Sequence, residues 1–218
     1  MRQPVNGVMG DGACGDGGGR TLIVLASASP RRAELLRQVG IEFEVCVADV
    51  EEDAASTLAD PAEITLQHAR EKALQVAAHA PGRLVLGADT VVVLDGRVLE
   101  KPRDADEARE MLRALSGRTH EVITGVAIAT LRDGGPQVLV EDHVRTAVEF
   151  RALTDEETEA YVACGEPMDK AGAYGIQGRG ALLVKGIAGC YSNVVGLPLS
   201  RTWQMLQAAE TRILTGSP

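Results

Sequence analysis

Long apolar runs are absent from this sequence of 218 residues: no stretch approaches the roughly 20 apolar residues that a membrane-spanning helix needs. The start of the chain also lacks a charged region followed by an apolar one, which is the pattern of a secretory signal. These absences argue against membrane insertion and against secretion. We therefore expect a cytoplasmic protein with no membrane partner.

Paired metal-binding or disulfide-forming residues are absent too. The four cysteines and the four histidines are scattered along the chain, and no two cysteines form a C-x-x-C pair. A zinc site or a disulfide framework is therefore not expected, and this cysteine usage fits a reducing cytosol.

Positive charge is in deficit, with 22 Lys and Arg against 31 Asp and Glu and a formal net charge of -9. Broad, sequence-independent binding to nucleic acid needs a positive surface that displaces counterions, so we expect no nucleic-acid partner. A few basic side chains that converge in a cleft can still hold one small polyanion, particularly if a divalent cation shares the site.

What the sequence does contain is enough apolar residues, 45% of the chain, for one well-packed domain. Apolar runs alternate with helix-capping signals, which predicts a single mixed α/β domain over residues 21–214. We expect strands near residues 22–26, 43–48, 84–94, 97–100, 120–131, 137–150 and 181–185, a loop at 193–197, and helices near 30–39, 61–80, 105–116, 155–164 and from 198 onward. The break that Thr124 and Gly125 make in the apolar pattern is expected to interrupt one strand, and Trp203 is expected to pack in the last helix.

Residues 1–20 are rich in glycine and contain almost nothing that could be buried. This composition predicts a disordered leader. A glycine-rich phosphate loop is the alternative, but such loops follow a strand, whereas this segment precedes the first one.

The first strand–turn–helix unit is a candidate phosphate site. Ser29 is a good N-cap, Pro30 suits the first helical position, and Gly40 is a natural stop. The free N–H groups and the positive dipole end of a helix start favour an anion. Arg31 and Arg32 in the first turn oppose that dipole unless something negative is present. The turn is therefore expected to bind phosphates, with a solvated charged turn as the alternative.

Asp89 and Thr90 interrupt an otherwise wholly apolar strand. Burying an unpaired carboxylate costs several kcal/mol, so Asp89 needs a partner. That partner is an arginine if the role is structural, and a metal or a catalytic water if it is functional. A hairpin turn at Asp95–Gly96 then returns the chain to Lys101, which we expect near the level of Asp89.

Three further features have both a functional and a structural interpretation. The acidic stretch 51–53 is a solvated loop or a cation site, and the loop is favoured because acidic loops are commonplace. Lys72 lies off the centre of the apolar stripe of its helix, where most lysines are solvated. The glycine-dense stretch 166–180 is an irregular connection or a ligand-binding loop, and its length without predicted structure favours the second.

Three separated stretches resemble one family. They are Ser-Ala-Ser-Pro-Arg-Arg at 27–32, Gly-Ala-Asp-Thr-Val at 87–91 with Lys-Pro at 101–102, and Asp-Lys-Ala-Gly-Ala-Tyr-Gly-Ile-Gln-Gly at 169–178. Together they resemble the Maf family of nucleoside triphosphate pyrophosphatases, once described as septum formation inhibitors. The resemblance covers roughly residues 22–206.

The resemblance implies hydrolysis of the bond between the α and β phosphates of a nucleotide, which gives a monophosphate and pyrophosphate, with Mg²⁺ or Mn²⁺ as the cofactor. It implies an elongated α/β fold around a long twisted mixed sheet flanked by helices, similar to that of the inosine triphosphatases, and a homodimer. The third stretch resembles the branch that acts on dTTP and UTP. The alternatives are the 7-methyl-GTP branch and a nucleotide-binding regulator of cell division without turnover.

The resemblance also implies roles for individual residues. Asp89 matches the proton acceptor, and Glu52 matches an acidic residue of the cleft, so both are candidate metal ligands. Gln177 can offer a donor and an acceptor to a pyrimidine edge. The residues expected to bind substrate or set its choice are Ser27, Ser29, Arg31, Arg32, Lys72, Thr90, Lys101 and Gln177.

Overall fold

A seven-stranded mixed sheet is the centre of the computed structural model, which describes residues 23–50 and 60–215. The strand order is β2-β1-β3-β5-β6-β7, and β4 pairs with β3 outside this path. β1 pairs in parallel with β2 and β3, and the other pairs are antiparallel. The strands are β1 (Ile23–Leu25), β2 (Phe43–Val45), β3 (Leu84–Leu94), β4 (Arg97–Leu99), β5 (Thr119–Arg132), β6 (Gly135–Phe150) and β7 (Val184–Ala188).

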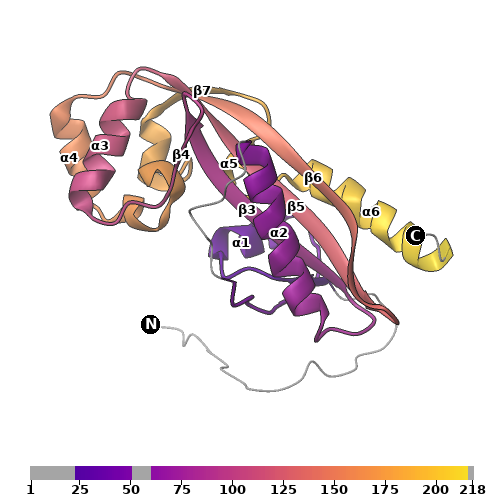
Figure 1. Cartoon of the computed structure of the whole chain (residues 1–218). Helices are drawn as coiled ribbons and strands as arrows, with labels where there is room; N and C mark the ends of the chain where they lie inside the picture. The colour runs from indigo at the N-terminus through magenta and orange to yellow at the C-terminus, as the bar shows by residue number, and fades with distance from the viewer. Residues whose placement is uncertain (1–22, 51–59, 216–218) are drawn as a thin grey trace, which may run out of the picture.

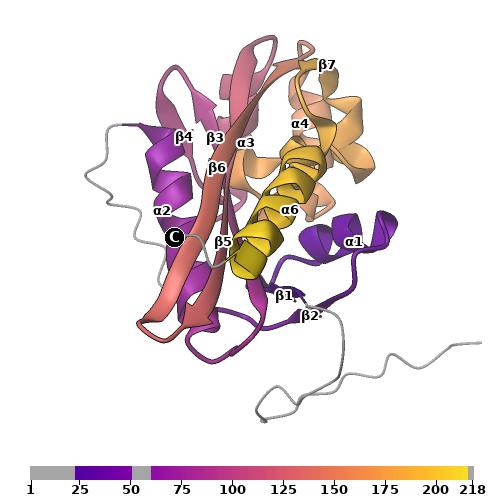
Figure 2. The ribbon, with the colours of Figure 1, turned by 90° about the vertical axis from the view of Figure 1, so that its right-hand side faces the viewer.

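Helices cover both faces of this elongated sheet. α2 lies on one face and α6 on the other (Figure 2), while α3 and α4 lie together at one end of the molecule (Figure 1). This arrangement confirms the predicted mixed α/β class with a long sheet flanked by helices. The helices are α1 (Pro30–Gln38), α2 (Pro61–Ala77), α3 (Ala105–Leu115), α4 (Asp155–Ala163), α5 (Tyr191–Val195) and α6 (Leu199–Thr215).

Side-chain caps mark the starts of α2, α3 and α4. Asp60 accepts a hydrogen bond from the N–H of Ala62 at 3.0 Å at the start of α2. Thr154 and Glu157 form a complete capping box at the start of α4. Positive φ angles follow the ends of α1, α3 and α4 at glycines, as the sequence predicts: Gly40, Gly117 and Gly165.

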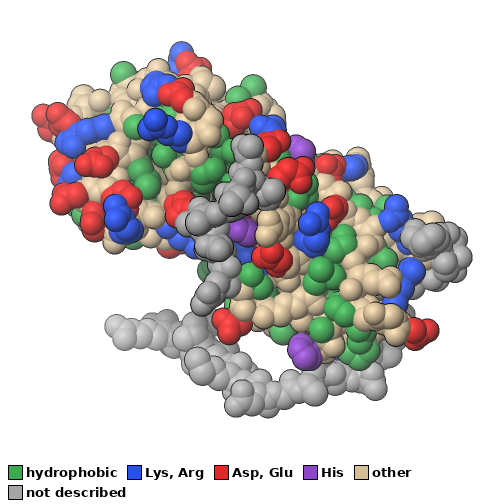
Figure 3. Space-filling view, viewed as in Figure 1, with side chains coloured by type: hydrophobic (Ala, Val, Ile, Leu, Met, Phe, Trp, Pro, Cys, Tyr) green, Lys and Arg blue, Asp and Glu red, His purple; other side chains and the backbone are tan. Residues whose placement is uncertain are grey.

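Exposed ion pairs join the two helices at the far end of the molecule. Arg109 on α3 pairs with Glu159 on α4 at 2.8 Å, and Arg113 pairs with Asp155 at 3.0 Å. Figure 3 shows acidic and basic side chains interspersed over this end. Exposed ion pairs contribute little to stability, so the apolar cluster beneath them, with Leu112 and Phe150 fully buried, holds this end together.

One edge of β3 is open in the middle. β5 pairs with β3 from Val85 to Val93 on one side. On the other side β1 pairs with Leu84–Leu86 and β4 with Val92–Leu94. Within the described residues no strand pairs with Gly87–Val91 on that second side, and we call this stretch the β3 gap. Because β1 ends here and its chain turns into α1, the gap is a natural place for a ligand.

Glycine lets α2 approach the sheet closely beside this gap. A Cβ built on Gly87 would lie 2.2 Å from the carbonyl oxygen of Ala69, and one on Gly125 would lie 2.5 Å from the carbonyl carbon of Thr65. The prediction that Thr124 and Gly125 interrupt their strand is therefore wrong. β5 runs through both residues, and Gly125 is where the helix backbone packs on it.

The stretch 166–180 contains more structure than the sequence indicates. It forms three short 3-10 helices, η1 (Glu166–Asp169), η2 (Ala171–Ala173) and η3 (Gly178–Leu182). The last of these displaces the strand predicted at 181–185, so that β7 begins at Val184. Glu166 accepts from the N–H groups of Arg179 and Gly180 and so holds this turn. Glycine fits at position 180 because a Cβ there would lie 1.9 Å from the carbonyl oxygen of Gly175.

Four smaller expectations also differ from the structure. The loop predicted at 193–197 begins as α5, β2 is shorter than predicted, and α2 ends at Ala77. Trp203 does not pack inside, since it is 51% exposed. The buried stripe of α6 follows helical spacing on the adjacent face, and it consists of Thr202, Met205, Leu206 and Ala209.

Two predictions concern parts of the chain outside the described residues: the disordered leader at 1–20 and the acidic stretch 51–53. The single domain over 21–214 stays a prediction as well.

Across residues 23–50 and 60–215, no helix is both long enough and apolar enough to span a bilayer.

Replacing Gly87 by alanine should lower the free energy of unfolding by about 3 kcal/mol, because the new methyl group would collide with the backbone of α2. Urea denaturation measures this change. Gly186→Ala is the matched control, since a Cβ there meets nothing within 4 Å, and its effect should stay within about 0.5 kcal/mol. Equal losses in the two variants would contradict the close approach of α2.

Candidate active site

A cavity of about 580 Å³ lies against the β3 gap. It is lined by the β1–α1 turn, by β3, by part of the 166–178 segment and by the residues around Gly196 after α5. Every described residue that the sequence predicts for the site lines this cavity: Ser27, Ser29, Arg31, Arg32, Lys72, Asp89, Thr90, Lys101 and Gln177. Glu52 lies outside the described residues.

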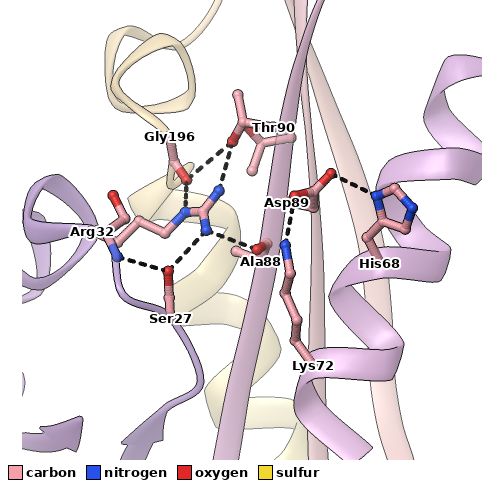
Figure 4. A network of polar contacts seen from close by, with 10 residues as sticks. Ser27, Arg32, His68, Lys72, Ala88, Asp89, Thr90 and Gly196 are labelled. Carbon is pink, nitrogen blue, oxygen red and sulfur yellow. Dashed lines mark hydrogen bonds and ion pairs between the residues drawn. The ribbon is translucent and has the colours of Figure 1, made fainter. Parts of the chain in front are cut away.

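Asp89 lies at the centre of a buried polar cluster. Its carboxylate accepts a hydrogen bond from Nζ of Lys72 at 2.7 Å and lies 3.2 Å from Nδ1 of His68 (Figure 4). Asp89 is 7% exposed and Lys72 is 8% exposed. The structural alternative for Asp89 predicted an arginine partner, but the partner is a lysine. The solvated alternative for Lys72 is wrong as well, because its side chain is buried.

The charge state of Asp89 follows from these neighbours. Burial raises the pKa of Asp89, but the hydrogen bond from His68 and the positive charges of Lys72 and Arg32 lower it more, so that this pKa lies well below its ordinary value. The protein's own cations and the His68 hydrogen bond thus outweigh the effect of burial on this pKa. The side chain is therefore an ionised carboxylate at neutral pH.

His68 is one residue that sequence reasoning missed. It lies one helical turn before Lys72 on α2, so the two side chains project on the same side of the helix. That i, i+4 spacing was the available signal. A lone histidine does not reveal which strand its helix packs on, and Asp89 is 21 positions away in the sequence.

Arg32 is buried and donates to four acceptors among the described residues. Its Nε donates to the carbonyl oxygen of Gly196 at 2.9 Å, and its Nη1 donates to Oγ of Ser27 at 3.0 Å and to the carbonyl oxygen of Ala88 at 2.8 Å. Its Nη2 donates to Oγ1 of Thr90 at 3.1 Å (Figure 4). Arg32 therefore joins the β1–α1 turn, β3 and the residue after α5, and so holds three walls of the cavity together.

The start of α1 differs in one respect from its prediction. Ser29 lies at the N-cap position, as predicted, but its side chain makes no capping hydrogen bond. Its backbone N–H instead donates to Oγ of Ser27 at 3.2 Å. Arg31 in the first turn reaches across to Asp169 on η1 at 3.0 Å. The first turn of α1 is thus not capped by Ser29 and faces the cavity.

The 166–180 segment forms a firm wall rather than a loose connection. Both carboxylate oxygens of Glu166 are used: they accept from the hydroxyl of Tyr161 at 2.9 Å and from the N–H groups of Arg179 and Gly180 at 3.1 Å each. These bonds close the turn that carries Gln177. Sequence reasoning also missed this role of Glu166, because its two backbone partners come within reach only in the folded turn.

The carboxylates fit one mode of divalent metal binding. Across the described parts of the chain, no group of three or more His, Cys, Asp or Glu side chains gathers that could cage a metal ion. Mg²⁺ commonly binds through one or two carboxylates together with substrate phosphates and water. The ionised carboxylate of Asp89, at the wall of a cavity lined by cations, fits that mode.

Comparison with known proteins gives consistent results. Residues 22–209 match the Maf family, described as Maf-like protein. The chain is 54% identical over 194 residues to a dTTP/UTP pyrophosphatase of Symbiobacterium thermophilum, covering 89% of this chain and 97% of that one. It is 52% identical over 191 residues to a dTTP/UTP pyrophosphatase of Escherichia coli O157:H7, covering 85% and 92%.

A more distant similarity links the chain to a solved structure. A nucleoside-triphosphatase / dITP/XTP pyrophosphatase from Mycobacterium abscessus is 18% identical, with 88% of this chain and 97% of that chain covered and a TM-score of 0.42. A likeness at this level supports no conclusion about the site.

Replacing Lys72 by methionine should lower the free energy of unfolding by about 3 kcal/mol, because the buried carboxylate of Asp89 loses its closest cation. Adding Asp89→Asn to that variant should restore part of the loss, since the uncompensated charge is then removed as well. Urea denaturation of the two single variants and the double variant measures the interaction.

Arg70→Met is the matched control on the same helix. Arg70 pairs with Glu141 at 2.7 Å, but both side chains are partly exposed, so this change should cost at most about 1 kcal/mol. An equal cost for Lys72→Met and Arg70→Met would contradict a buried Asp89–Lys72 pair.

Proposed function

Because this chain belongs to the Maf family, we propose that it hydrolyses dTTP and UTP, including modified pyrimidine nucleoside triphosphates, to the monophosphate and pyrophosphate with the help of a divalent metal ion. One observation carries this proposal: nine predicted site residues from five separate places in the sequence line a single cavity. The names of relatives about half identical to this chain support the same substrates.

The cations around the cavity suit a triphosphate. Arg31, Lys72 and Lys101 come from α1, from α2 and from the residues after β4, and all three line the cavity. Phosphoryl transfer is catalysed mainly by positioning and by neutralising charge on the phosphate oxygens. Three cations that reach one cavity from separate elements can do both, even in a chain with a net charge of -9.

Asp89 is the proposed metal ligand and proton acceptor, with Glu52 as a second ligand by resemblance. A bound Mg²⁺ or Mn²⁺ would neutralise phosphate charge and lower the pKa of a water molecule. The ionised carboxylate of Asp89 is the form that can bind a cation or accept a proton.

Substrate binding would make Asp89 a better base. Nζ of Lys72 lies 2.7 Å from the carboxylate of Asp89 and lowers its pKa. A bound triphosphate would also attract the positive charge of Lys72, so the effect of Lys72 on the pKa of Asp89 would weaken. A water oxygen then forms a bond to phosphorus, its proton passes to Asp89, and the bond between the α and β phosphates breaks as pyrophosphate leaves. His68 stays hydrogen-bonded to the carboxylate and keeps its orientation.

The pyrimidine preference is supported by Gln177, which lines the cavity on a turn held by Glu166. An amide side chain matches the alternating carbonyl and N–H of uracil and thymine. The homodimer and the cytoplasmic location stay predictions from the sequence and the family resemblance.

A panel of dTTP, UTP, CTP, GTP and 7-methyl-GTP should give rapid release of pyrophosphate from dTTP and UTP only. Removal of divalent metal with EDTA should abolish turnover, and Mg²⁺ or Mn²⁺ should restore it. Orthophosphate as the product would contradict the proposed bond cleavage. Preferential turnover of 7-methyl-GTP would place the chain in the 7-methyl-GTP branch of the family. Nucleotide binding without any product would favour a regulator of cell division without turnover.

Asp89→Asn should reduce kcat for dTTP by about 10²- to 10⁴-fold, because the amide can neither accept the proton nor bind the metal ion with full charge. Steady-state kinetics with dTTP and Mg²⁺ measure this loss. Asp106→Asn on the exposed surface of α3 is the control and should keep wild-type kcat. An Asp89→Asn enzyme that keeps most of its activity would show that another group accepts the proton.

A further inference from the structure

The hydroxyl group of Thr124 has a fixed direction. Thr124 is fully buried on β5, directly opposite Thr90 on β3. Its Oγ1 donates to the carbonyl oxygen of Asn193 at 3.2 Å, and a carbonyl oxygen can only accept. A hydroxyl carries one hydrogen. In the 3.0 Å contact between the two threonine hydroxyls, Thr90 is therefore the donor and Thr124 the acceptor.

This direction determines what Thr90 can offer to a ligand. Nη2 of Arg32 donates to Oγ1 of Thr90 at 3.1 Å, which uses one lone pair. The hydrogen of Thr90 is used by Thr124, and the carbonyl oxygen of Gly196, at 3.5 Å, is a longer alternative for the same hydrogen. One lone pair remains. Thr90 lines the cavity, so toward a ligand it is an acceptor.

Ser27, on the other side of Arg32, has the opposite character. Its Oγ accepts from Nη1 of Arg32 at 3.0 Å and from the backbone N–H of Ser29 at 3.2 Å. Both lone pairs are thus in use, and the hydroxyl hydrogen remains for a ligand. Ser27 also lines the cavity, so the two hydroxyls that Arg32 binds differ toward a ligand. Ser27 is a donor because the Ser29 N–H uses its second lone pair, and Thr90 is an acceptor because Thr124 uses its hydrogen.

We propose that Thr124 is a positioning residue that sets the direction of the Thr90 hydroxyl, so that Thr90 binds an N–H or O–H donor of the nucleoside while Ser27 binds a phosphate oxygen. This inference rests on the proposed function. Ionised phosphate oxygens carry no hydrogen to donate, so they cannot pair with the remaining lone pair of Thr90. In dTTP the available donors are the imide N3–H and the 3′-hydroxyl.

Thr124→Val tests this role without removing a structural bond that the fold needs. The carbonyl oxygen of Asn193 also accepts from the N–H of Gly196 at 3.0 Å, so it keeps a partner in the variant. Valine has the shape of threonine and suits a strand. Thr90, however, loses its nearer acceptor and keeps only the longer contact with the carbonyl oxygen of Gly196 at 3.5 Å. Its hydrogen can then turn toward the ligand and compete with the ligand's own N–H or O–H.

The experiment compares KM and Kd for dTTP with the inhibition constant of tripolyphosphate, which has no nucleoside. In Thr124→Val, KM and Kd for dTTP should rise about tenfold while kcat changes little and the tripolyphosphate constant stays unchanged. Thr124→Ser, which keeps the hydroxyl, should restore wild-type values. Thr130→Val is the matched control, because Thr130 is another buried threonine of β5 that bonds only to a backbone carbonyl, that of Arg83, and does not line the cavity.

Two analogues identify the donor. N3-methyl-dTTP lacks the imide N–H, and 2′,3′-dideoxythymidine triphosphate lacks the 3′-hydroxyl. Wild-type enzyme should bind one of them about tenfold more weakly than dTTP, and Thr124→Val should bind that analogue and dTTP within about twofold of each other.

Three results would overturn the inference: an equal loss of tripolyphosphate binding in Thr124→Val, equal behaviour of the Val and Ser variants, or no discrimination against either analogue by the wild type. Failure of the wild type to hydrolyse dTTP would instead contradict the proposed function. The dissociation constants of the same ligands would still decide the direction of the Thr90 hydroxyl.

Discussion

The buried carboxylate of Asp89 is the constraint on which the site depends. A charge at this depth is tolerated because Lys72 and His68 on α2 lie within 3.2 Å of it. Those two side chains reach it only because α2 packs with its backbone against Gly87 and Gly125 of the sheet. The close approach of α2, which the two glycines allow, therefore determines which charged groups surround Asp89.

A second constraint is the interrupted edge of β3. Consecutive side chains of a strand point to opposite faces, so Asp89 faces α2 while Thr90 faces Arg32 and the residue after α5 (Figure 4). A cavity at the open edge of β3 contacts both faces. A triphosphate bound there can therefore meet a carboxylate and a lysine on one side and a hydroxyl network on the other. Arg32 connects the walls through four hydrogen bonds, which keeps that geometry fixed.

The sequence predicts the elements and site members that depend on local signals. Capping residues such as Asp60 and Thr154, and the glycine after α4, act within one turn, and their positions agree with the structure. The hairpin at Asp95–Gly96 predicted the place of Lys101, and the family resemblance supplied Gln177; both residues line the cavity. Partners set by tertiary packing were not predictable: which strand His68 faces, which backbone groups Glu166 binds, and the outward position of Trp203 all depend on how distant elements meet.

The most direct measurement is a crystal structure with the non-hydrolysable analogue α,β-imido-dTTP and Mn²⁺, whose anomalous signal locates the metal. The account predicts the triphosphate in the cavity at the β3 gap, in contact with Arg31 and Lys101, and the metal ion on the carboxylate of Asp89. Either of two results would contradict this prediction: a nucleotide bound outside the cavity, or a metal ion that does not contact Asp89 while Asp89 stays paired with Lys72.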